Sequence, residues 1–243
     1  MRLLSFTYIV LTCISPLAGF ALEKQVIDGV TYSVMQSQPE QVEIFWKNPD
    51  GKQLRTIPAV AKDYKKRGVE IEVIMNGGIF EPGGIPSGLL VQNGKELNPI
   101  NRKEGEGNFY LKPNGIFVIH QLGASVIRTE EYPVADTHAL YAVQSGPLLL
   151  RNGSIHPIFK ADSKYRLHRN GIGVTKSRKV ILAITDINSP KFPNLYEFAQ
   201  LFKKLGCDDA LFLDGDISQM KTGADALKPS NGFGSYIIVK PKK

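Results

Sequence analysis

The stretch VILAITDINSPKFPNLYEFAQLFKKLGCDDALFLDGDIS, residues 180–218, decides the fold. Two apolar runs, at 180–185 and 210–213, enclose a segment in which apolar residues recur at helical spacing. Asn194 and Glu197 have the spacing of a capping box at the start of this helix, and a glycine ends it. Because a strand, a helix and a strand in this order form a crossover, we expect two neighbouring parallel strands here.

Short strands and turns are predicted for the remainder of the chain. A second helix is predicted at about 58–67, and turn signals such as Asn93-Gly94 and Asn152-Gly153 separate many of the apolar runs. The other predicted strands lie near 26–35, 41–46, 69–75, 87–92, 108–112, 116–120, 139–144, 147–151, 171–175 and 235–239. The sequence therefore predicts an α+β fold of mixed, largely antiparallel sheets, with one parallel strand–helix–strand crossover near the C-terminus.

Residues 1–21 have the pattern of a cleavable secretory leader. A positive charge precedes an apolar run, and Gly19 and Ala21 supply small residues at the spacing that a signal peptidase reads. We therefore expect a periplasmic or secreted protein with a single domain over 22–243 and no integral membrane anchor after cleavage. A lipid anchor at Cys13 and a retained helix are the alternatives.

Length, composition and charge exclude several classes of protein. A chain of 243 residues with 42% hydrophobic content can bury a sizeable core, which excludes a disordered protein. The net charge of +7 comes from scattered lysines and arginines, so we expect no nucleic-acid partner. Two cysteines cannot form a disulfide framework. Cys207, which remains after leader removal, has acidic neighbours that raise a thiol pKa, so we expect it to be buried and inert.

Acidic residues follow both strands of the predicted crossover. Asp186 comes directly after the first strand, and Asp214 and Asp216 come after the second. Because open α/β sheets bind ligands beyond the carboxyl ends of their strands, we expect Asp186 and Asp214 to line one crevice. The alternative for Asp186 is that it caps a turn.

The acidic segment also resembles the opening of a calcium loop, with Asp214, Asp216 and Ser218 at alternate positions. An EF-hand would need glycine at Gln219 and glutamate at Asp225, so that motif is excluded. A looser divalent-cation site at Asp214 and Asp216, with calcium as the candidate ion, stays open.

Two further segments have residue types suited to binding a sugar phosphate. Asn76 offers an amide to hydroxyl or phosphate oxygens, and Gly77 and Gly78 allow backbone N–H groups to approach a ligand closely. Arg169 precedes a glycine-containing strand, where its guanidinium would hold a phosphate by two parallel hydrogen bonds, or would be a surface charge. The chain has no P-loop or GxGxxG motif, no HExxH motif, and no GxSxG frame around Ser145. All four histidines are expected to be ordinary surface or core residues.

Taken in order, these segments resemble the phosphodiester glycosidase family from about residue 71 to the C-terminus. The similar stretches are 76–80 (Asn-Gly-Gly-x-Phe in the family), 145–153 (Ser-Gly-Pro-x-Leu-x-x-x-Gly), 168–173 (Pro-Arg-Thr-Ala-x-Gly), 184–186 (the start of Val-Asp-Gly-Arg) and 210–218 (Ala-x-x-Leu-Asp-Gly-Gly-x-Ser). The chain departs from the family at Asp216, where glycine is usual, and at Asn170-Gly171, where threonine and alanine are usual. It also has Ile187-Asn188 in place of Gly-Arg, which removes one anion-binding group.

The resemblance implies an exported hydrolase that cleaves the sugar C1–O bond of a sugar-1-phosphodiester of the GlcNAc-1-phosphate type. The products would be the sugar and a phosphomonoester. Phosphate is a good leaving group, with a second pKa of about 6, so its departure needs charge stabilisation more than protonation. The implied catalytic residues are Asp214, Asp186 and Arg169, and the implied substrate-binding residues are Asn76, Gly77, Gly78, Ser145, Gly146 and Ser218.

Two alternatives stay open at this point. A non-catalytic envelope protein that binds phosphorylated glycans would use the same arginine and asparagine without needing Asp214. A metal-dependent phosphodiesterase would cut the P–O bond instead, and its product would be a sugar-1-phosphate.

Overall fold

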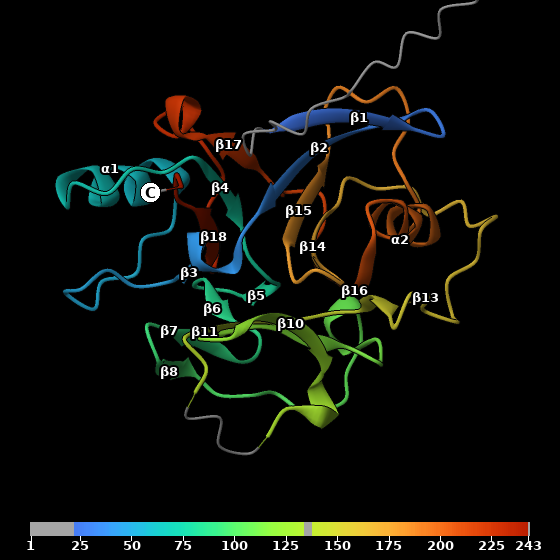
Figure 1. The fold of residues 1–243 in the computed structure, drawn as a ribbon, viewed down its shortest axis with the longest axis horizontal. Helices are drawn as coiled ribbons and strands as arrows, with labels where there is room; N and C mark the ends of the chain where they lie inside the picture. The colour runs from blue at the N-terminus through green and yellow to red at the C-terminus, as the bar shows by residue number, and fades with distance from the viewer. Residues whose placement is uncertain (1–21, 134–137, 243) are drawn as a thin grey trace, which may run out of the picture.

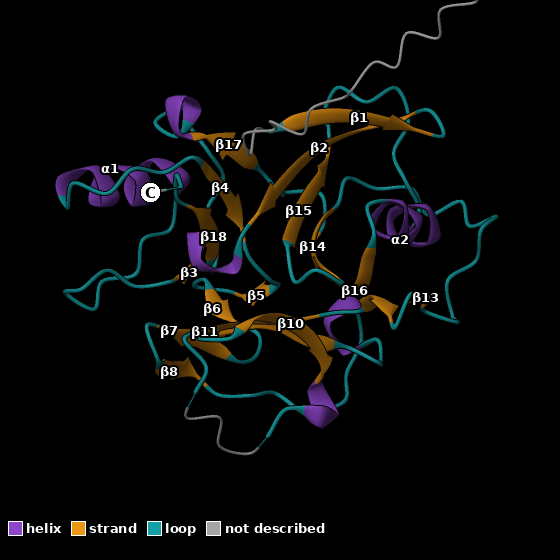
Figure 2. Cartoon of the chain, in the orientation of Figure 1, coloured by secondary structure: helices purple, strands orange, loops and turns teal. Residues whose placement is uncertain are grey.

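The computed structural model describes residues 22–133 and 138–242, and the predicted leader at 1–21 lies outside the described residues. Within these ranges the chain forms three main sheets and two α-helices. The helices α1 (Ile57–Lys66) and α2 (Leu195–Lys204) lie on opposite sides of the view in Figures 1 and 2. A short two-stranded sheet, β5 (Phe80–Glu81) with β6 (Ile85–Pro86), lies between them. The α+β class predicted from the sequence is confirmed.

The sheets are built from hydrogen-bonded neighbours in the following orders. The seven-stranded sheet has the order β1 (Glu23–Ile27), β2 (Val30–Ser37), β15 (Val180–Thr185), β14 (Asn170–Thr175), β16 (Cys207–Asp214), β12 (Leu148–Arg151) and β13 (Ser154–Ile155). The five-stranded sheet has the order β10 (Gly123–Arg128), β9 (Gly115–His120), β11 (Tyr141–Ser145), β7 (Leu90–Gln92) and β8 (Lys95–Asn98). The four-stranded sheet has the order β17 (Met220–Thr222), β4 (Val73–Asn76), β18 (Tyr236–Val239) and β3 (Val42–Phe45).

The crossover differs from the prediction in one respect. β15 and β16 run in the same direction, and α2 connects them, but they are not neighbours. β14 lies between them and pairs antiparallel with both. Local sequence indicates the strand–helix–strand connection, but it does not indicate that another strand lies between β15 and β16. That strand, β14, precedes β15 in the chain and forms a hairpin with it. The adjacent parallel pair that we expected is therefore wrong.

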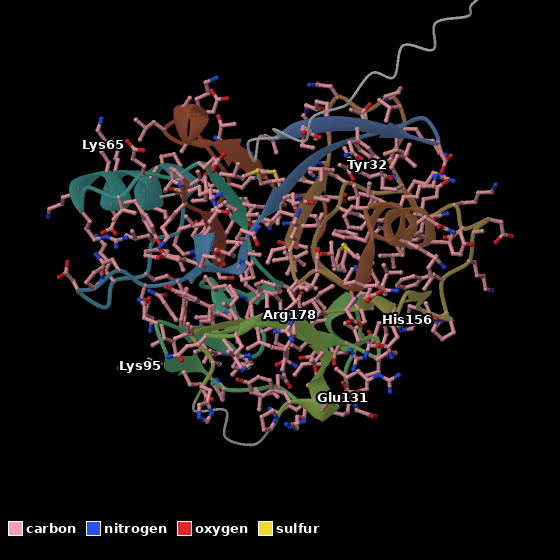
Figure 3. The ribbon with its side chains drawn as sticks, in the orientation of Figure 1. Tyr32, Lys65, Lys95, Glu131, His156 and Arg178 are labelled. Carbon is pink, nitrogen blue, oxygen red and sulfur yellow. The ribbon has the colours of Figure 1, made fainter. Side chains whose placement is uncertain are left out.

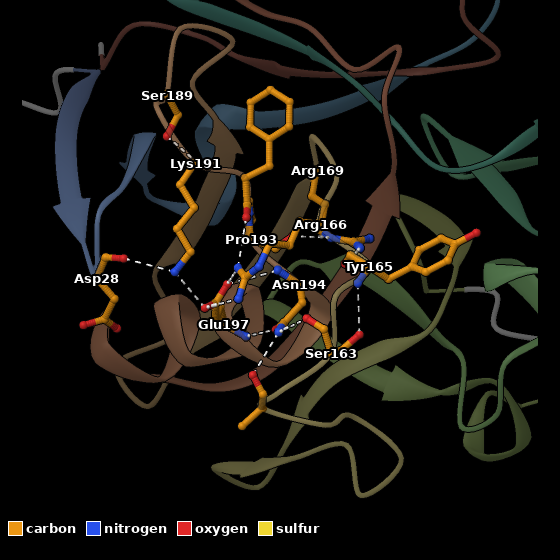
Figure 4. Close-up of polar contacts among 12 residues, drawn as sticks. Asp28, Ser163, Tyr165, Arg166, Arg169, Ser189, Lys191, Pro193, Asn194 and Glu197 are labelled. Atoms are coloured by element: carbon orange, nitrogen blue, oxygen red, sulfur yellow. Dashed lines mark hydrogen bonds and ion pairs between the residues drawn. The ribbon is translucent and has the colours of Figure 1, made fainter.

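Helix α2 is fixed at its start by a dense set of contacts (Figure 4). The side chain of Asn194 accepts a hydrogen bond from the Glu197 backbone N–H (2.9 Å), and the Glu197 side chain accepts one from Asn194 N–H (3.1 Å), which confirms the capping box. Arg166 forms an ion pair with Glu197. The apolar face of the helix buries Phe198 and Phe202 against the seven-stranded sheet.

The central core lies where the three sheets meet, and side chains fill the space between them (Figure 3). It includes Met35 of β2, Ile44 of β3, Phe117 of β9 and Leu182 of β15, all of them buried. Cys207 is also buried, and burial raises the pKa of its thiol to about 12, as expected of an inert cysteine.

Three strand predictions are wrong in detail. The strand expected at 26–35 is a hairpin of β1 and β2, with a turn of positive φ at Asp28 and Gly29. The strand expected at 108–112 is a 3-10 turn at Asn108–Tyr110, which Asn114 closes by donating from Nδ2 to the Phe109 carbonyl (2.7 Å). The strand expected at 69–75 begins only at Val73. Strand propensity alone does not fix these boundaries, because it is a weak preference that local hydrogen bonds and packing override.

The N-cap of α2 gives a first prediction. Asn194 also donates from Nδ2 to the carbonyls of Ala161 (3.1 Å) and Ser163 (3.0 Å), so Asn194→Ala removes a cap and two further hydrogen bonds. We expect the free energy of unfolding to fall by about 2 kcal/mol or more in urea denaturation. The matched control is Thr56→Ala at the start of α1, where the cap is one 3.3 Å hydrogen bond, with an expected loss of about 0.5–1 kcal/mol. Equal losses in the two variants would contradict this reading of the loop before α2.

Candidate functional site

Strand β14 brings the predicted acidic segments to one edge of the seven-stranded sheet. Because β14 is antiparallel to both neighbours, its first residue lies beside the last residues of β15 and β16. Asn170 is the register partner of Ile184 on one side and of Asp214 on the other. Asp186, which follows β15 directly, lies at the same edge.

Asn76, Asn170 and Asp214 form a hydrogen-bonded set, here called the amide–carboxyl cluster. Asn170 donates from Nδ2 to the backbone carbonyl (2.9 Å) and the Oδ1 atom (3.2 Å) of Asn76, and its own Oδ1 accepts from the Asp214 backbone N–H (2.8 Å). Asn76 donates from Nδ2 to the Asp214 carboxylate (3.2 Å). Both asparagines are buried, so the cluster is a fixed feature of the fold.

The carboxyl group of Asp214 has an unusual electrostatic environment. Burial raises its pKa to about 6, and the negative charge of Asp216 acts in the same direction. Hydrogen bonds from the Gly215 backbone N–H (2.8 Å) and from Asn76 oppose this shift because they favour the charged form. The result is a carboxylate that is ionised at neutral pH and more basic than an ordinary aspartate.

A hollow of about 390 Å³ opens beside this cluster, here called the Asp186 hollow. Its charged and polar lining includes Asp186, Asp216, Ser218, His168, Lys24 and Lys221. Ser218 connects the hollow with the cluster, because its Oγ accepts a 3.5 Å hydrogen bond from Asn76 Nδ2. Asn76, Asp214 and Ser218 are thus in contact, and Ser218 and Asp186 line the same hollow. Asp214 is not among the lining residues of that hollow, so the single crevice expected to contain both Asp186 and Asp214 stays a prediction.

Asp186 is already paired inside its hollow. Lys24 of β1 contacts the Asp186 carboxylate and also donates to Ser33 Oγ (2.9 Å). The pKa of Asp186 is lowered, mainly by the hydrogen bond from Lys24. This aspartate is therefore an ionised partner of a lysine at neutral pH.

His168 was expected to be an ordinary histidine, but it lines the Asp186 hollow. It is 4% exposed, and its Nδ1 has no hydrogen-bond partner in the described part of the chain. Burial lowers the pKa of His168, so the imidazole is neutral at neutral pH. The alternation of an extended segment places His168 and Asn170 toward the same side, which the sequence shows in retrospect.

Arg169 does not share this hollow, contrary to expectation. Its side chain is 2% exposed and faces the other side of the segment, over the ring of Phe212 (5.7 Å). The guanidinium donates from Nε to the Pro193 carbonyl and from Nη2 to the Tyr165 carbonyl, each at 3.2 Å (Figure 4). The alternation that aims His168 at the carboxylates thus turns Arg169 away from them.

The glycine pair at 77–78 is required for packing. A Cβ on Gly77 would lie 2.3 Å from Ser235 Oγ, and one on Gly78 would lie 2.9 Å from the Gln144 carbonyl. The Gly77 N–H, which we expected to face a ligand, donates instead to the Ser235 carbonyl (2.8 Å). These glycines let β4 pass close to the end of β11 and so place Asn76.

Ser145 and Gly146 also have packing roles where substrate contact was expected. Ser145 is fully buried, donates from Oγ to the Leu213 carbonyl (2.8 Å) and accepts from the Ile79 N–H (3.3 Å). A Cβ on Gly146 would lie 2.6 Å from the Cβ of Asn114. These contacts tie β11 to the end of β16, one residue before Asp214.

The proposed cation site at Asp214 and Asp216 gains no support from the geometry. Among residues 22–133 and 138–242, no group of three or more histidine, cysteine, aspartate or glutamate side chains is arranged to hold a metal ion. Calcium takes six to eight oxygen ligands, and both Asp214 oxygens already accept hydrogen bonds. A divalent-cation site at Asp214 and Asp216 therefore stays a prediction from the sequence.

Sequence reasoning missed two members of this site besides His168. Asn170 was noted only as a departure from a family pattern, yet it holds Asn76 and Asp214 together. Lys24 is 162 positions away from its partner Asp186, and no local pattern links them. Only the antiparallel pairing of β2 with β15, which places β1 near this edge, brings Lys24 there.

Comparisons with known proteins show what this chain and its fold are similar to. The chain is 31% identical over 210 residues to the uncharacterized protein YigE of Escherichia coli K12, covering 84% of this chain and 80% of that protein. The fold is similar to the zebrafish N-acetylglucosamine-1-phosphodiester alpha-N-acetylglucosaminidase catalytic domain, auto-inhibited by its pro-peptide (TM-score 0.64, 17% identity, 91% of this chain and 82% of that one). It is also similar to a putative exported protein of Burkholderia pseudomallei (TM-score 0.59, 12% identity, 87% and 74% covered).

The sequence pattern of one family matches most of the segments described above. Residues 69–231 match the phosphodiester glycosidase pattern, a range that contains the whole amide–carboxyl cluster and most of the Asp186 hollow. The resemblance noted from the sequence motifs is thereby confirmed. The chain belongs to the phosphodiester glycosidase family.

Proposed function

We propose that this protein is an exported hydrolase that cleaves the C1–O bond of a sugar-1-phosphodiester of the GlcNAc-1-phosphate type. Family membership supports the reaction class, and the leader-like sequence at 1–21 supports a periplasmic or secreted location. Neither helix in the described part of the chain is long and apolar enough to cross a membrane. The single observation that carries the proposal is the Asp214 carboxyl, raised in pKa and held by Asn76 beside an open, charged hollow.

In this proposal Asp214 acts at the anomeric carbon. Its carboxylate stabilises the positive charge that develops at C1 and accepts a proton from the attacking water. The water oxygen bonds to C1, the C1–O bond breaks, and its electron pair leaves with the phosphate. A pKa near 6 suits this task, because the group is ionised at neutral pH and is still basic enough to take a proton.

The phosphate needs positive charge rather than an acid. Lys24 and Lys221 line the Asp186 hollow and are the proposed partners of the departing phosphate. Asp186 then has a positioning role, because it holds the Lys24 ammonium group in place. Ser218, which lines the hollow, is the proposed contact of a sugar hydroxyl, and the buried Asn76 positions Ser218 and Asp214.

A substitution at Asp214 tests the catalytic assignment. We expect Asp214→Asn to lower kcat by about 100-fold or more on a GlcNAc-1-phosphate alkyl ester, because the amide neither takes a proton nor carries charge. Asp50→Asn, an exposed aspartate distant from the cluster in sequence, is the matched control and should keep its activity.

The same assay distinguishes the bond that is cut. In ¹⁸O-water the label should enter the released sugar, because water attacks C1. Label in the phosphate together with a sugar-1-phosphate product would mean P–O cleavage and would overturn the proposal. Tight substrate binding without turnover in the wild-type protein would instead favour a glycan-phosphate binding protein.

The raised pKa of Asp214 also predicts a pH profile. A phosphodiester does not titrate near neutrality, so an acidic limb in kcat/KM belongs to the enzyme. We expect activity to fall as the pH drops through about 6, because protonated Asp214 neither accepts a proton nor stabilises positive charge. Asp216→Asn should move this limb to lower pH, because the Asp216 charge raises the pKa of Asp214.

Warming identifies the titrating group. A carboxyl ionises with little enthalpy change, so the limb should stay in place when the assay is warmed, whereas an imidazole limb would move to lower pH. A limb that moves on warming would assign the titration to His168 and contradict the role given to Asp214.

A further inference from the structure

A second hollow lies on the α2 side of the segment that leads into β14, and it is here called the Arg169 hollow. Its volume is about 330 Å³, at the lower end of the range for small-molecule sites. Leu111, Phe159, Leu167 and Leu195 form apolar walls, and Arg169 contributes the charged group. Among the described residues, its lining shares no member with the Asp186 hollow.

The Arg169 guanidinium is a buried cation without an acidic partner in the described part of the chain. The residue is 2% exposed, and its contacts in the described part of the chain are hydrogen bonds to two backbone carbonyls, of Pro193 and Tyr165, and the ring of Phe212. Such a charge normally pairs with a carboxylate, because removing an unpaired ion from water is unfavourable. The neighbouring Arg166 has that arrangement with Glu197, and Arg169 does not.

One edge of the guanidinium faces the hollow. Nη1 of Arg169 makes no hydrogen bond in the described structure. It is also not among the side-chain atoms that are both sealed from solvent and unpaired, which are Ser37 Oγ, Asn114 Oδ1, His168 Nδ1 and Tyr236 OH. Because Arg169 lines the hollow, Nη1 is the guanidinium nitrogen left with donors for an oxyanion there.

The charge on Arg169 persists at neutral pH. Burial lowers its pKa to about 10, and the charge of Asp216 and the Tyr32 hydroxyl partly offset that effect. Asp216 lines the other hollow and makes no ion pair with Arg169 in the described structure, so it does not occupy the guanidinium. A planar guanidinium with free N–H groups matches the oxygen spacing of phosphate and carboxylate groups.

The exposed residues at the rim of the Arg169 hollow are also large and apolar, or positively charged. Tyr165 and Ile158 are 76% and 56% exposed, which is unusual for large apolar side chains, and both line the hollow. Lys160 adds a second positive charge at the rim. The Arg169 hollow thus combines apolar walls with the positive charges of Arg169 and Lys160.

We propose that the Arg169 hollow binds a small oxyanion, phosphate or carboxylate, that carries an apolar chain or ring. The anionic group pairs with the Arg169 guanidinium, and the apolar part lies between the leucine walls and the exposed Tyr165. This site is separate from the Asp186 hollow and does not depend on the hydrolase reaction proposed above.

Calorimetric titration of the full chain tests this site with four probes. We expect octyl phosphate and octanoate to bind at least about 10-fold more tightly than octanol, which lacks the anion, and than inorganic phosphate, which lacks the chain. The ratio between octyl phosphate and octanoate shows which oxyanion is preferred. Octanol binding as tightly as octyl phosphate would overturn the proposal, because Arg169 would then contribute nothing.

Substitutions locate the binding. Ile158→Asp places a negative charge at the exposed rim and should weaken octyl phosphate binding by about 10-fold or more, whereas Leu122→Asp, an 85% exposed position outside both hollows, should leave it unchanged. Arg169→Met should remove the preference for octyl phosphate over octanol. If Arg169→Met fails to fold, because the guanidinium joins two loops, Ile158→Asp still decides the question.

A third variant separates the two hollows. Lys24→Met changes the Asp186 hollow only and should not affect octyl phosphate binding at the Arg169 hollow. Loss of binding in Lys24→Met together with full binding in Ile158→Asp would show that the probe occupies the Asp186 hollow, and would overturn the inference. Because the readout is binding of a non-substrate, absence of hydrolase activity leaves this test intact.

Discussion

The side-chain amide of Asn170 links two sheets by hydrogen bonds, and the position of the Asp214 carboxyl depends on this link. Its Nδ2 group donates to Asn76 at the end of β4, and its Oδ1 accepts from the Asp214 backbone at the end of β16. A buried amide with these partners cannot shift without leaving polar groups unsatisfied, which costs about 1–3 kcal/mol for each group. The Asp214 carboxyl is therefore held in one place, partly removed from water, and its raised pKa is a consequence of that position.

The small residues near the cluster allow the sheets to pack closely enough for these hydrogen bonds to form. Gly77 and Gly78 allow close contact of β4 with Ser235 and β11, and Ser145 links β11 to the carbonyl of Leu213. These residues look like ligand contacts in the sequence, because glycine-rich turns after strands are common in binding sites. Here they set the distance between sheets, and the side chains that face open space are those of other residues.

One extended segment supplies both hollows. Because side chains alternate along it, His168 faces the Asp186 hollow while Arg169 faces the other side. The two hollows differ in charge balance: Lys24 is paired with Asp186 in the first, whereas the guanidinium in the second meets only backbone carbonyls. The family motif that contains the arginine thus contributes to two separate surfaces of this protein.

The sequence alone determined the α+β class, both helices, the capping box at Asn194 and the family, because these follow from local periodicity, local hydrogen bonds and motif order. It also placed Asp186 and Asp214 at one sheet edge. Only the tertiary structure decided that β14 separates the crossover strands and that Lys24 pairs with Asp186. The tertiary structure also decided which side of the sheet the Arg169 side chain faces. Those features depend on strand order and register, which arise from packing between segments distant in the chain and leave no local pattern.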